Sequence, residues 1–341
     1  MKLENKLVHI FNSHGIGDVI MTLPMIESVL NEGGRLLISV KGKAESDIIG
    51  AALGGGGSDN IEFIHLSRYP GFFGALSYIA QLQSKKIDIS IPVTGIHPDK
   101  YNFMAFLSRA KYRVGCGGHL SFLNDNNFCT HRFFHKVEKN LEILSCVIPL
   151  STDIELTCLS AYQTDSDFFG SRNLKPEGKV IALAPSSGEA ESHKRWSLEN
   201  FHELAKYLIS RGNTVVILGS PGEEGLAGRI LKNLNSEAVH NFVGALSIKE
   251  SLDCLEQCDF LIANCNGLSH MGSLVPSLKI IGLYGPTNPM LTGPFRRDLV
   301  AVNTNLDCSP CYKRGYITGC GDPVCMRSID VSLVIKEIII D

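Results

Sequence analysis

A carboxylate stands at the start of a predicted helix near the N-terminus. The segment Gly15-Ile16-Gly17-Asp18 follows an apolar run at residues 7–13 and precedes an amphipathic stretch. A strand, a glycine turn and a helix start together expose backbone N–H groups, so this place suits an anion or a sugar. Asp18 has two interpretations: it is a general base, or it only interacts favourably with the helix dipole. No third glycine stands at the spacing of a dinucleotide-binding turn, which disfavours a nicotinamide-dependent dehydrogenase.

A second polar turn follows the apolar run at residues 179–184. It contains Ser186 and Ser187, and Lys194 comes a few residues later. Two hydroxyls and a lysine after a strand end could hold a diphosphate. The alternative is a polar loop with a surface lysine.

A third turn combines Asn266 and Gly267 with His270, after the apolar run at 260–264. Backbone amides at the start of a short helix here could face a phosphate. His270 is either part of that site or an ordinary core histidine. The rigid turn at residues 285–289 follows the next apolar run and should lie at the same sheet edge.

The eleven cysteines include a cluster of four, which are Cys308, Cys311, Cys320 and Cys325. Four thiols have the ligand type and number for a structural zinc or iron ion in tetrahedral geometry. The x2, x8 and x4 spacings are not a double CxxC pattern, so reduced thiols or occasional disulfides remain the alternative.

Positive charge is concentrated between residues 100 and 139. This stretch has seven Lys and Arg, Arg109 and Arg113 among them, against two acidic residues, Asp125 and Glu138. It is either a solvated face or a landing site for an anionic acceptor.

Apolar runs alternate with helical patterns along the whole chain, which predicts parallel, doubly wound α/β sheets. The expected strands are 7–13, 35–40, 61–66, 87–93, 112–116, 179–186, 213–220, 238–244, 259–265 and 279–287. The expected helices are 19–34, 72–84, 101–109, 131–148, 198–212, 223–234, 248–258, 267–275 and 330–340, with Ser197 as an N-cap. Polar, irregular sequence at 150–178 marks the boundary between two Rossmann-like domains, and a ligand should bind in a cleft at the carboxyl ends of their strands.

Composition excludes several classes of protein. The 341 residues are 44% hydrophobic and 20% charged with a net charge of −3, so the chain is neither disordered nor a polycation built for nucleic acid. No apolar run approaches the roughly 18 residues that span a bilayer, and the N-terminus does not resemble a secretory signal. Many cysteines without such a signal indicate a reducing, cytoplasmic compartment.

Several of these segments together resemble glycosyltransferase family 9, the bacterial heptosyltransferases of lipopolysaccharide core assembly. They are GIGDVIMTLPMI, HRFFHKVEKNLEIL, APSS with HKRWSLENFHELA, NGLSH, LYGPTNP and the cysteine-containing tail, so the resemblance covers residues 7–330. It implies a GT-B fold, in which two Rossmann-like domains face a central cleft. The acceptor-binding domain would be residues 1–160 and the nucleotide-sugar domain 161–325, with a C-terminal helix at 326–341 packing back toward the first domain.

The resemblance also implies roles for individual residues. Asp18 would be the general base of an inverting transfer that needs no catalytic metal. The implied donor-binding residues are Ser186, Ser187, Lys194, Glu223, Asn266, Gly267 and His270. The implied acceptor-binding residues are Gly17, Arg109 and Arg113.

The implied donor is a nucleotide-diphosphate sugar, ADP-heptose, and the implied acceptor an anionic lipid-linked saccharide of the lipopolysaccharide core. The enzyme would then work in the cytoplasm, at the inner face of the inner membrane. One departure keeps alternatives open: Cys265-Asn266 stands where family members have Asp-Thr. The alternatives are another nucleotide sugar, a protein acceptor, or a protein that binds a nucleotide sugar without catalysis.

Overall fold

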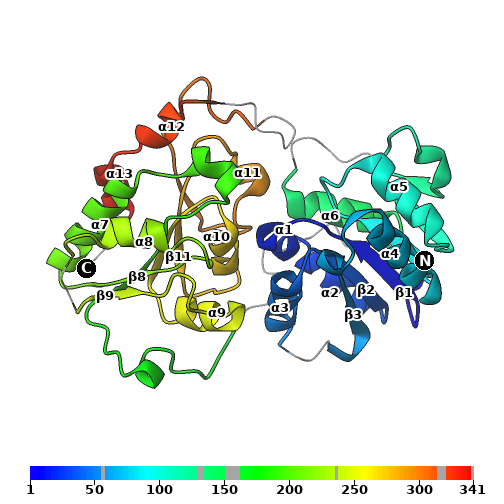
Figure 1. Ribbon diagram of the computed structural model, residues 1–341, viewed down its shortest axis with the longest axis horizontal. Coiled ribbons are helices and arrows are strands. Elements are labelled where there is room, and N and C mark those ends of the chain that lie inside the picture. Colours follow the sequence, from blue (N-terminus) through cyan, green and yellow to red (C-terminus); the bar gives the residue numbers. More distant parts are fainter. Residues whose placement is uncertain (55–57, 129–133, 150–161, 235–236, 313–319, 339–341) are drawn as a thin grey trace. The chain divides into compact units, whose positions relative to one another are not determined.

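The computed structural model describes residues 1–54, 58–128, 134–149, 162–234, 237–312 and 320–338. The chain divides into two compact units, Met1–Ser160 and Ala161–Asp341. Each unit contains a six-stranded sheet, and every strand pairing in both sheets is parallel (Figure 1).

The first unit has strand order β3-β2-β1-β4-β5-β6. Its strands are β1 (Leu7–Phe11), β2 (Arg35–Val40), β3 (Ile61–His65), β4 (Ile89–Pro92), β5 (Tyr112–Gly115) and β6 (Asn126–Asn127). Its helices are α1 (Ile16–Ile20), α2 (Leu23–Asn31), α3 (Lys43–Ala52), α4 (Gly71–Ser84), α5 (Pro98–Leu107) and α6 (Lys136–Ser145), with short 3-10 turns η1 (Ser58–Asn60), η2 (Leu66–Arg68) and η3 (Ser121–Leu123). Right-handed crossovers put α4 and α5 on one face of the sheet and α1–α3 on the other. The contacts agree, because α4 touches α5 and α1 touches α3.

The second unit repeats this plan with strand order β12-β11-β10-β7-β8-β9. Its strands are β7 (Val180–Ala184), β8 (Thr214–Ile217), β9 (Val239–Asn241), β10 (Phe260–Asn264), β11 (Lys279–Leu283) and β12 (Val300–Val302). Its helices are α7 (Leu198–Ser210), α8 (Glu224–Leu231), α9 (Ile248–Glu256), α10 (Gly267–Gly272), α11 (Pro289–Thr292), α12 (Val324–Arg327) and α13 (Val331–Glu337), with 3-10 turns η4 (Gly170–Arg172) and η5 (Glu189–Lys194). The α/β class is therefore as expected, and Ser197 caps α7 by accepting from the Asn200 amide.

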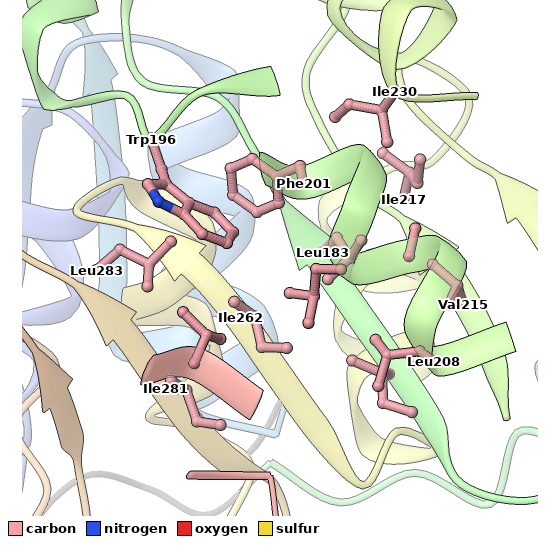
Figure 2. Packing of buried hydrophobic residues seen from close by; sticks show 14 of the residues in the cluster. Leu183, Trp196, Phe201, Leu208, Val215, Ile217, Ile230, Ile262, Ile281 and Leu283 are labelled. Atoms are coloured by element: carbon pink, nitrogen blue, oxygen red, sulfur yellow. The ribbon is translucent and has the colours of Figure 1, made fainter. Parts of the chain in front are cut away.

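The second unit is centred on the only tryptophan of the chain. Trp196 is fully buried, meets the Phe201 ring edge to face at 4.9 Å, and packs with Leu183, Ile262 and Leu283 from three neighbouring strands (Figure 2). Its indole N–H donates to the Ile329 carbonyl at 2.7 Å, which satisfies a polar group that is otherwise costly to bury.

The C-terminal helix belongs to this same core. Val334 of α13 and Ile338 just after it are buried in the cluster around Trp196, and α13 contacts α7 and β12. Helix α13 therefore packs within the second unit, and the expectation that it packs back toward the first domain stays a prediction. The apolar face of α13 packs on the core of the second unit, and the Ile329 carbonyl before the helix accepts from Trp196 of the same unit.

Local structure departs from expectation at three places. The helix expected at 19–34 is two helices, because Pro24 near the start of α2 has no N–H to continue the hydrogen bonding of α1. Helix α3 was not expected, and β6 and β12 are too short to leave a pattern in the sequence. Among the described helices, none is long and apolar enough to cross a membrane.

Candidate functional site

Each sheet has a position where the crossovers change direction, and polar loops meet there. In the first unit this position lies between β1 and β4, and in the second between β7 and β10. Ligands of open α/β sheets bind outside the carboxyl ends of the strands at such points. The first helix after β1 carries Asp18, and the loops after β7 and β10 carry Ser186, Ser187 and Asn266.

Asp18 lies in α1 beside two basic side chains. The Lys136 ammonium, at the first position of α6, donates to Asp18 Oδ1. His14 Nδ1 lies 4.0 Å from Asp18 Oδ2. The Asp18 side chain is 27% exposed and that of Lys136 18%, so the pair is reachable from solvent yet partly desolvated.

A network of side chains holds this arrangement. Thr22 Oγ1 donates to the Asp18 carbonyl at 2.8 Å and accepts from Asn12 Nδ2 at 3.1 Å. Asn140 of α6 donates to the Met21 carbonyl at 3.0 Å and accepts from the Thr94 amide at 2.9 Å. Helix α6, which begins with Lys136, is thereby tied to the turn between α1 and α2 and to the loop after β4.

The immediate surroundings of His14 favour its neutral form. Burial lowers the pKa of His14, the nearby Asp18 carboxylate opposes that shift, and Lys136 adds to it. Gly95 makes room here: its φ is +92°, and a Cβ at this position would lie 3.3 Å from His14 Nε2 and 3.5 Å from Lys136 Nζ. A residue other than glycine at position 95 would therefore have a strained backbone, and its side chain would crowd His14 and Lys136.

The two arginines expected to bind the acceptor lie elsewhere in the first unit. Arg109 precedes β5 and Arg113 is its second residue, so both lie toward the amino ends of the strands, the edge opposite Asp18. The Arg113 guanidinium donates to the Leu123 and Ala110 carbonyls and pairs with Asp125 at 3.1 Å, which makes it part of the fold. Of the three expected acceptor residues only Gly17 is near Asp18, and all three roles stay predictions.

In the second unit, two asparagines connect the loops after β7 and β10. Asn264 donates to the Pro185 carbonyl at 2.7 Å and accepts from the Trp196 amide at 3.0 Å. Asn266 donates to the Ser186 carbonyl at 2.8 Å and caps α10 by accepting from the Ser269 amide at 2.9 Å. Asn266 therefore shapes the turn through its own side chain.

Lys194 lies within a cluster that the sequence did not suggest. Its ammonium donates to Glu191 Oε1 at 2.6 Å and lies 4.7 Å from the centre of the Tyr312 ring. The Tyr312 hydroxyl also donates to Glu191, at 3.2 Å. Burial and the Glu191 carboxylate raise the pKa of Tyr312 well above its usual range, so it stays protonated.

The remaining expected donor residues lie around the same sheet edge. Ser187 is buried, donates to the Glu191 carbonyl at 2.8 Å and accepts from Arg195 Nε at 3.2 Å. Glu223 stands at the start of α8, where its carboxylate accepts from the Ser220 amide at 2.7 Å. His270 is buried within α10. Their donor-binding roles stay predictions.

Of the four clustered cysteines, Cys308, Cys320 and Cys325 are free thiols in the structure. Cys308 and Cys320 are exposed, Cys311 is half-buried and Cys325 is buried, and burial raises the pKa of the Cys325 thiol. Within the described part of the chain, no group of three or more histidine, cysteine or acidic side chains has the arrangement of a metal site. The structure therefore gives no support for the expected structural zinc or iron ion.

Fold and site together define a class of protein. Two doubly wound parallel sheets, each with polar loops at its switch point, are the architecture of the GT-B enzymes. The sequence profile of glycosyltransferase family 9 (heptosyltransferase) matches residues 77–320. The chain belongs to this family.

Individual relatives agree with that assignment. The lipooligosaccharide heptosyltransferase 2 of Haemophilus influenzae is 28% identical over 209 residues, which are 57% of this chain and 60% of the relative. The lipopolysaccharide heptosyltransferase 2 of Salmonella typhimurium is 32% identical over 132 residues, 38% of this chain and 36% of the relative. The chain thus matches between about a third and three-fifths of the length of these curated relatives.

Solved structures share the fold over the whole chain. A family 9 glycosyltransferase from Veillonella parvula superposes with a TM-score of 0.76 at 20% identity, covering 98% of this chain and 97% of that one. The E. coli ADP-heptose LPS heptosyltransferase II gives 0.74 at 19% identity, covering 97% of each chain. The E. coli heptosyltransferase WaaC, solved with ADP, gives 0.70 at 18% identity, covering 97% of this chain and 98% of that one.

Proposed function

We propose that the protein is an inverting glycosyltransferase that moves a heptose from ADP-heptose to an anionic saccharide acceptor of the lipopolysaccharide-core type. The observation that carries this is the Asp18–Lys136 pair at the switch point of the first sheet. Membership in family 9 and the names of the relatives support the class of donor and acceptor. Related solved structures hold ADP and an ADP-2-deoxy-2-fluoro heptose, which supports the donor.

Asp18 would act as the general base. Lys136 bonds Oδ1 and favours the ionised carboxylate, and we assign the proton transfer to Oδ2. An acceptor hydroxyl within about 2.6–3.2 Å of Oδ2 would lose its proton to the carboxylate as its oxygen attacks C1 of the sugar. The C1–O bond to the diphosphate breaks at the same time on the opposite face, so the configuration at C1 inverts and ADP leaves with the bonding electrons.

The second unit would hold the donor. Negative charge grows on the leaving diphosphate, and Lys194 with the hydroxyls around Ser186 and Ser187 would stabilise it. Lys194 would exchange its contact with Glu191 for one with a phosphate. Arg195, which bonds the Ser187 hydroxyl and carbonyl, would fix this loop in place.

The same proposal covers the finer expectations about donor, acceptor and location. Glu223 would contact the nucleoside, and Gly267 and His270 would line the phosphate turn, as the family resemblance implies. Work on a lipid-linked acceptor would place the protein at the inner face of the cytoplasmic membrane. Metal analysis after purification without added metal tests the cysteine tail separately, with about one metal ion per chain expected if the four thiols bind one.

The test is transfer with defined substrates. The protein is incubated with ADP-heptose and a heptose-deficient lipopolysaccharide core, ADP release is followed, and the anomeric configuration of the product is read by NMR. Acceptor-dependent ADP release with inversion is expected. Retention of configuration, or ADP-heptose binding without transfer to any core acceptor, would overturn the proposal.

A melting-temperature panel of nucleotide diphosphates and nucleotide sugars addresses the alternative donor. A ligand that binds only the folded state raises the melting temperature. The largest shift is expected with ADP and ADP-heptose. A larger rise in melting temperature with another nucleotide sugar would identify that sugar as the donor in place of heptose. Such a donor is the second candidate because the buried Cys265 stands beside the turn.

A further inference from the structure

Three segments of the second unit bring polar side chains together at the carboxyl edge of its sheet. Glu191 and Lys194 belong to η5, in the loop after β7, and Tyr312 belongs to the segment that follows β12. The Tyr312 amide donates to the Pro286 carbonyl at 2.9 Å, so the turn after β11 holds this segment in place. The Ser187 hydroxyl holds η5 by donating to the Glu191 carbonyl at 2.8 Å. Tyr312 is thereby placed beside the loop that the proposed diphosphate would contact.

The two members of the Lys194–Glu191 ion pair differ in their access to water. The Lys194 side chain is 9% exposed and that of Glu191 is 38% exposed. A buried ammonium needs an anionic partner, because its lost hydration is otherwise not replaced. The carboxylate is the more exposed member, so it can turn toward water while the ammonium stays in place. Another anion can therefore replace the carboxylate on Lys194.

The ring of Tyr312 is fixed by its neighbours, whereas its hydroxyl makes only long hydrogen bonds. The ring stacks with the His193 imidazole at 5.7 Å, and its centre lies 4.7 Å from Lys194 Nζ. The hydroxyl lies 3.2 Å from Glu191 Oε1 and 3.2 Å from His193 Nε2. Hydrogen bonds between a hydroxyl and an oxygen are usually about 2.7–2.8 Å long. The hydroxyl is therefore positioned without being strongly bound, and it can donate to a better acceptor.

Both donors of this cluster point at the same oxygen atom. The Lys194 ammonium and the Tyr312 hydroxyl each donate to Glu191 Oε1. A phosphate group offers the same kind of acceptor, with more negative charge than a carboxylate and more oxygens to accept hydrogen bonds. A phosphate oxygen at the position of Oε1 would accept from the ammonium and from the hydroxyl together.

We propose that Tyr312 binds the diphosphate of the nucleotide sugar, and that a phosphate oxygen displaces the Glu191 carboxylate from both Lys194 and Tyr312. Glu191 would then turn toward water, and the phosphate oxygen would take over the two hydrogen bonds. The inference rests on the proposed donor site and adds Tyr312 to it as a residue that contacts the diphosphate. It holds for any base and any sugar on the donor, because both partners of Tyr312 in the exchange are anionic oxygens.

Calorimetry with pyrophosphate and with ADP tests the role of the hydroxyl. Tyr312→Phe keeps the ring beside Lys194 and removes only the hydroxyl. The Kd for each ligand should rise about tenfold, because a hydrogen bond to a charged phosphate is strong while the long bond to Glu191 contributes little. Pyrophosphate has neither base nor sugar, so its Kd reports the diphosphate contact alone. An unchanged Kd in a variant that melts at the wild-type temperature would overturn the proposal.

Tyr207 of α7 provides a matched control. It is also half-buried, and the Arg211 guanidinium lies 5.5 Å from the centre of its ring. It stands near the end of α7, which starts at the carboxyl edge of the sheet and runs back toward the amino edge. Tyr207→Phe should leave the Kd for pyrophosphate and for ADP unchanged. An equal rise in Kd in both tyrosine variants would contradict a specific contact at Tyr312.

A second variant leaves both donors intact and removes the competing charge. Glu191→Gln keeps the size of the side chain, and its neutral oxygen is a weaker acceptor than a carboxylate. The Kd for pyrophosphate should therefore fall, by about threefold or more. A higher Kd would show that Glu191 supports the ligand site instead of competing with the ligand, and would overturn the proposal. So would wild-type protein that does not bind pyrophosphate.

Failure of this inference is distinguishable from failure of the proposed reaction. The reaction fails if wild-type protein binds ADP-heptose without transferring heptose to a core acceptor. The inference fails if wild-type protein binds pyrophosphate and the Tyr312→Phe and Glu191→Gln variants bind it equally well. Each result can occur without the other, because binding of pyrophosphate needs neither the sugar nor the acceptor.

Discussion

The two units share one plan and differ in the chemistry at their switch points. In each, the crossovers between six parallel strands reverse direction beside the first strand, β1 or β7, and the polar loops gather there. The first unit places a carboxylate between two basic groups, Lys136 and His14. The second unit offers a lysine, hydroxyls and an amide-lined turn, with the Glu191 carboxylate bonded to Lys194. Topology thus decides where a ligand binds, and loop residues decide whether the site moves a proton or holds an anion.

The interiors differ as well. His9 in the middle of β1 is fully buried and bonds the Ser39 and Ser90 hydroxyls at 2.9 and 3.0 Å. Tyr78 of α4 and Tyr101 of α5 bond the same two serines, so a polar network ties both helices to the sheet. The middle residue of β7 is the apolar Ala182, and Trp196 packs in a cluster of hydrophobic side chains with its indole N–H bonded to the Ile329 carbonyl.

The largest expected effect separates proton transfer from donor binding. Asp18→Asn keeps the size of the side chain and removes the base, which typically costs about 10²–10⁴-fold in turnover. The Kd for ADP, measured by calorimetry, should stay within about twofold, because the change lies in the first unit. Normal turnover by this variant would show that Asp18 is not the general base. The two switch points would then not differ in proton transfer.

The next effect concerns the stability of the first unit in acid. Burial lowers the pKa of His9 from 6.5 to about 3 in the folded state. Between these values the unfolded chain binds a proton that the folded chain does not, so stability falls as the pH drops from about 6.5 toward 3. Below about pH 6 the slope approaches about 1.4 kcal/mol per pH unit, which gives about 50-fold in the unfolding constant from pH 6.5 to 4.5.

Hydrogen exchange read by mass spectrometry can assign this loss to one unit. After correction for the intrinsic rate, protection of β1 and β2 should fall on acidification more steeply than protection of β7 and β8. The variant His9→Asn should flatten the slope in the first unit. Equal slopes in both units would show that His9 is not the group that titrates.

A smaller effect is expected for the anion site of the second unit. Lys194→Met keeps most of the apolar stem and removes the ammonium, and hydrogen bonds to charged groups contribute about 1.5–3 kcal/mol. The Kd for ADP should therefore rise about 10- to 100-fold by calorimetry. Lys206→Met, which removes an exposed lysine on α7, is the matched control and should leave the Kd unchanged. An unchanged Kd for ADP in the Lys194 variant would show that the diphosphate does not bind at the loop after β7.

Much of the fold could be predicted from the sequence, and the exceptions have physical reasons. Buried parallel strands read as short apolar runs, so β1, β2, β7 and β10 were found within one or two residues. The break between α1 and α2 was missed although Pro24 marks it, because the apolar pattern continues across the break. The packing of α13 could not be read, since an apolar helix face does not say which sheet it covers.

The candidate site was predictable where a residue directly follows a strand. Ser186 and Asn266 stand in such turns and Asp18 in the first helix after β1, and parallel topology brings each to the carboxyl edge of its sheet. Lys136 is 118 residues from Asp18, and only its place in a basic stretch distinguished it. The number of basic residues in a stretch does not tell at which edge of the sheet they lie. Arg109 precedes β5, and this order assigns it to the edge opposite Asp18.

The smallest expected effect tests whether Lys136 holds Asp18 ready as a base. A neighbouring cation favours an ionised carboxylate, so Lys136→Ala should move the acid limb of kcat against pH upward, with turnover near pH 8 changed little. Of the other described groups around Asp18, His14 lies at the carboxylate, while Lys139, Glu138 and Glu142 lie further along α6. Lys136→Arg retains the charge and should restore the limb, and Lys139→Ala should leave it in place. A limb that does not move in Lys136→Ala, with turnover equally reduced at every pH, would assign Lys136 to the packing of α6 instead of to the proton transfer.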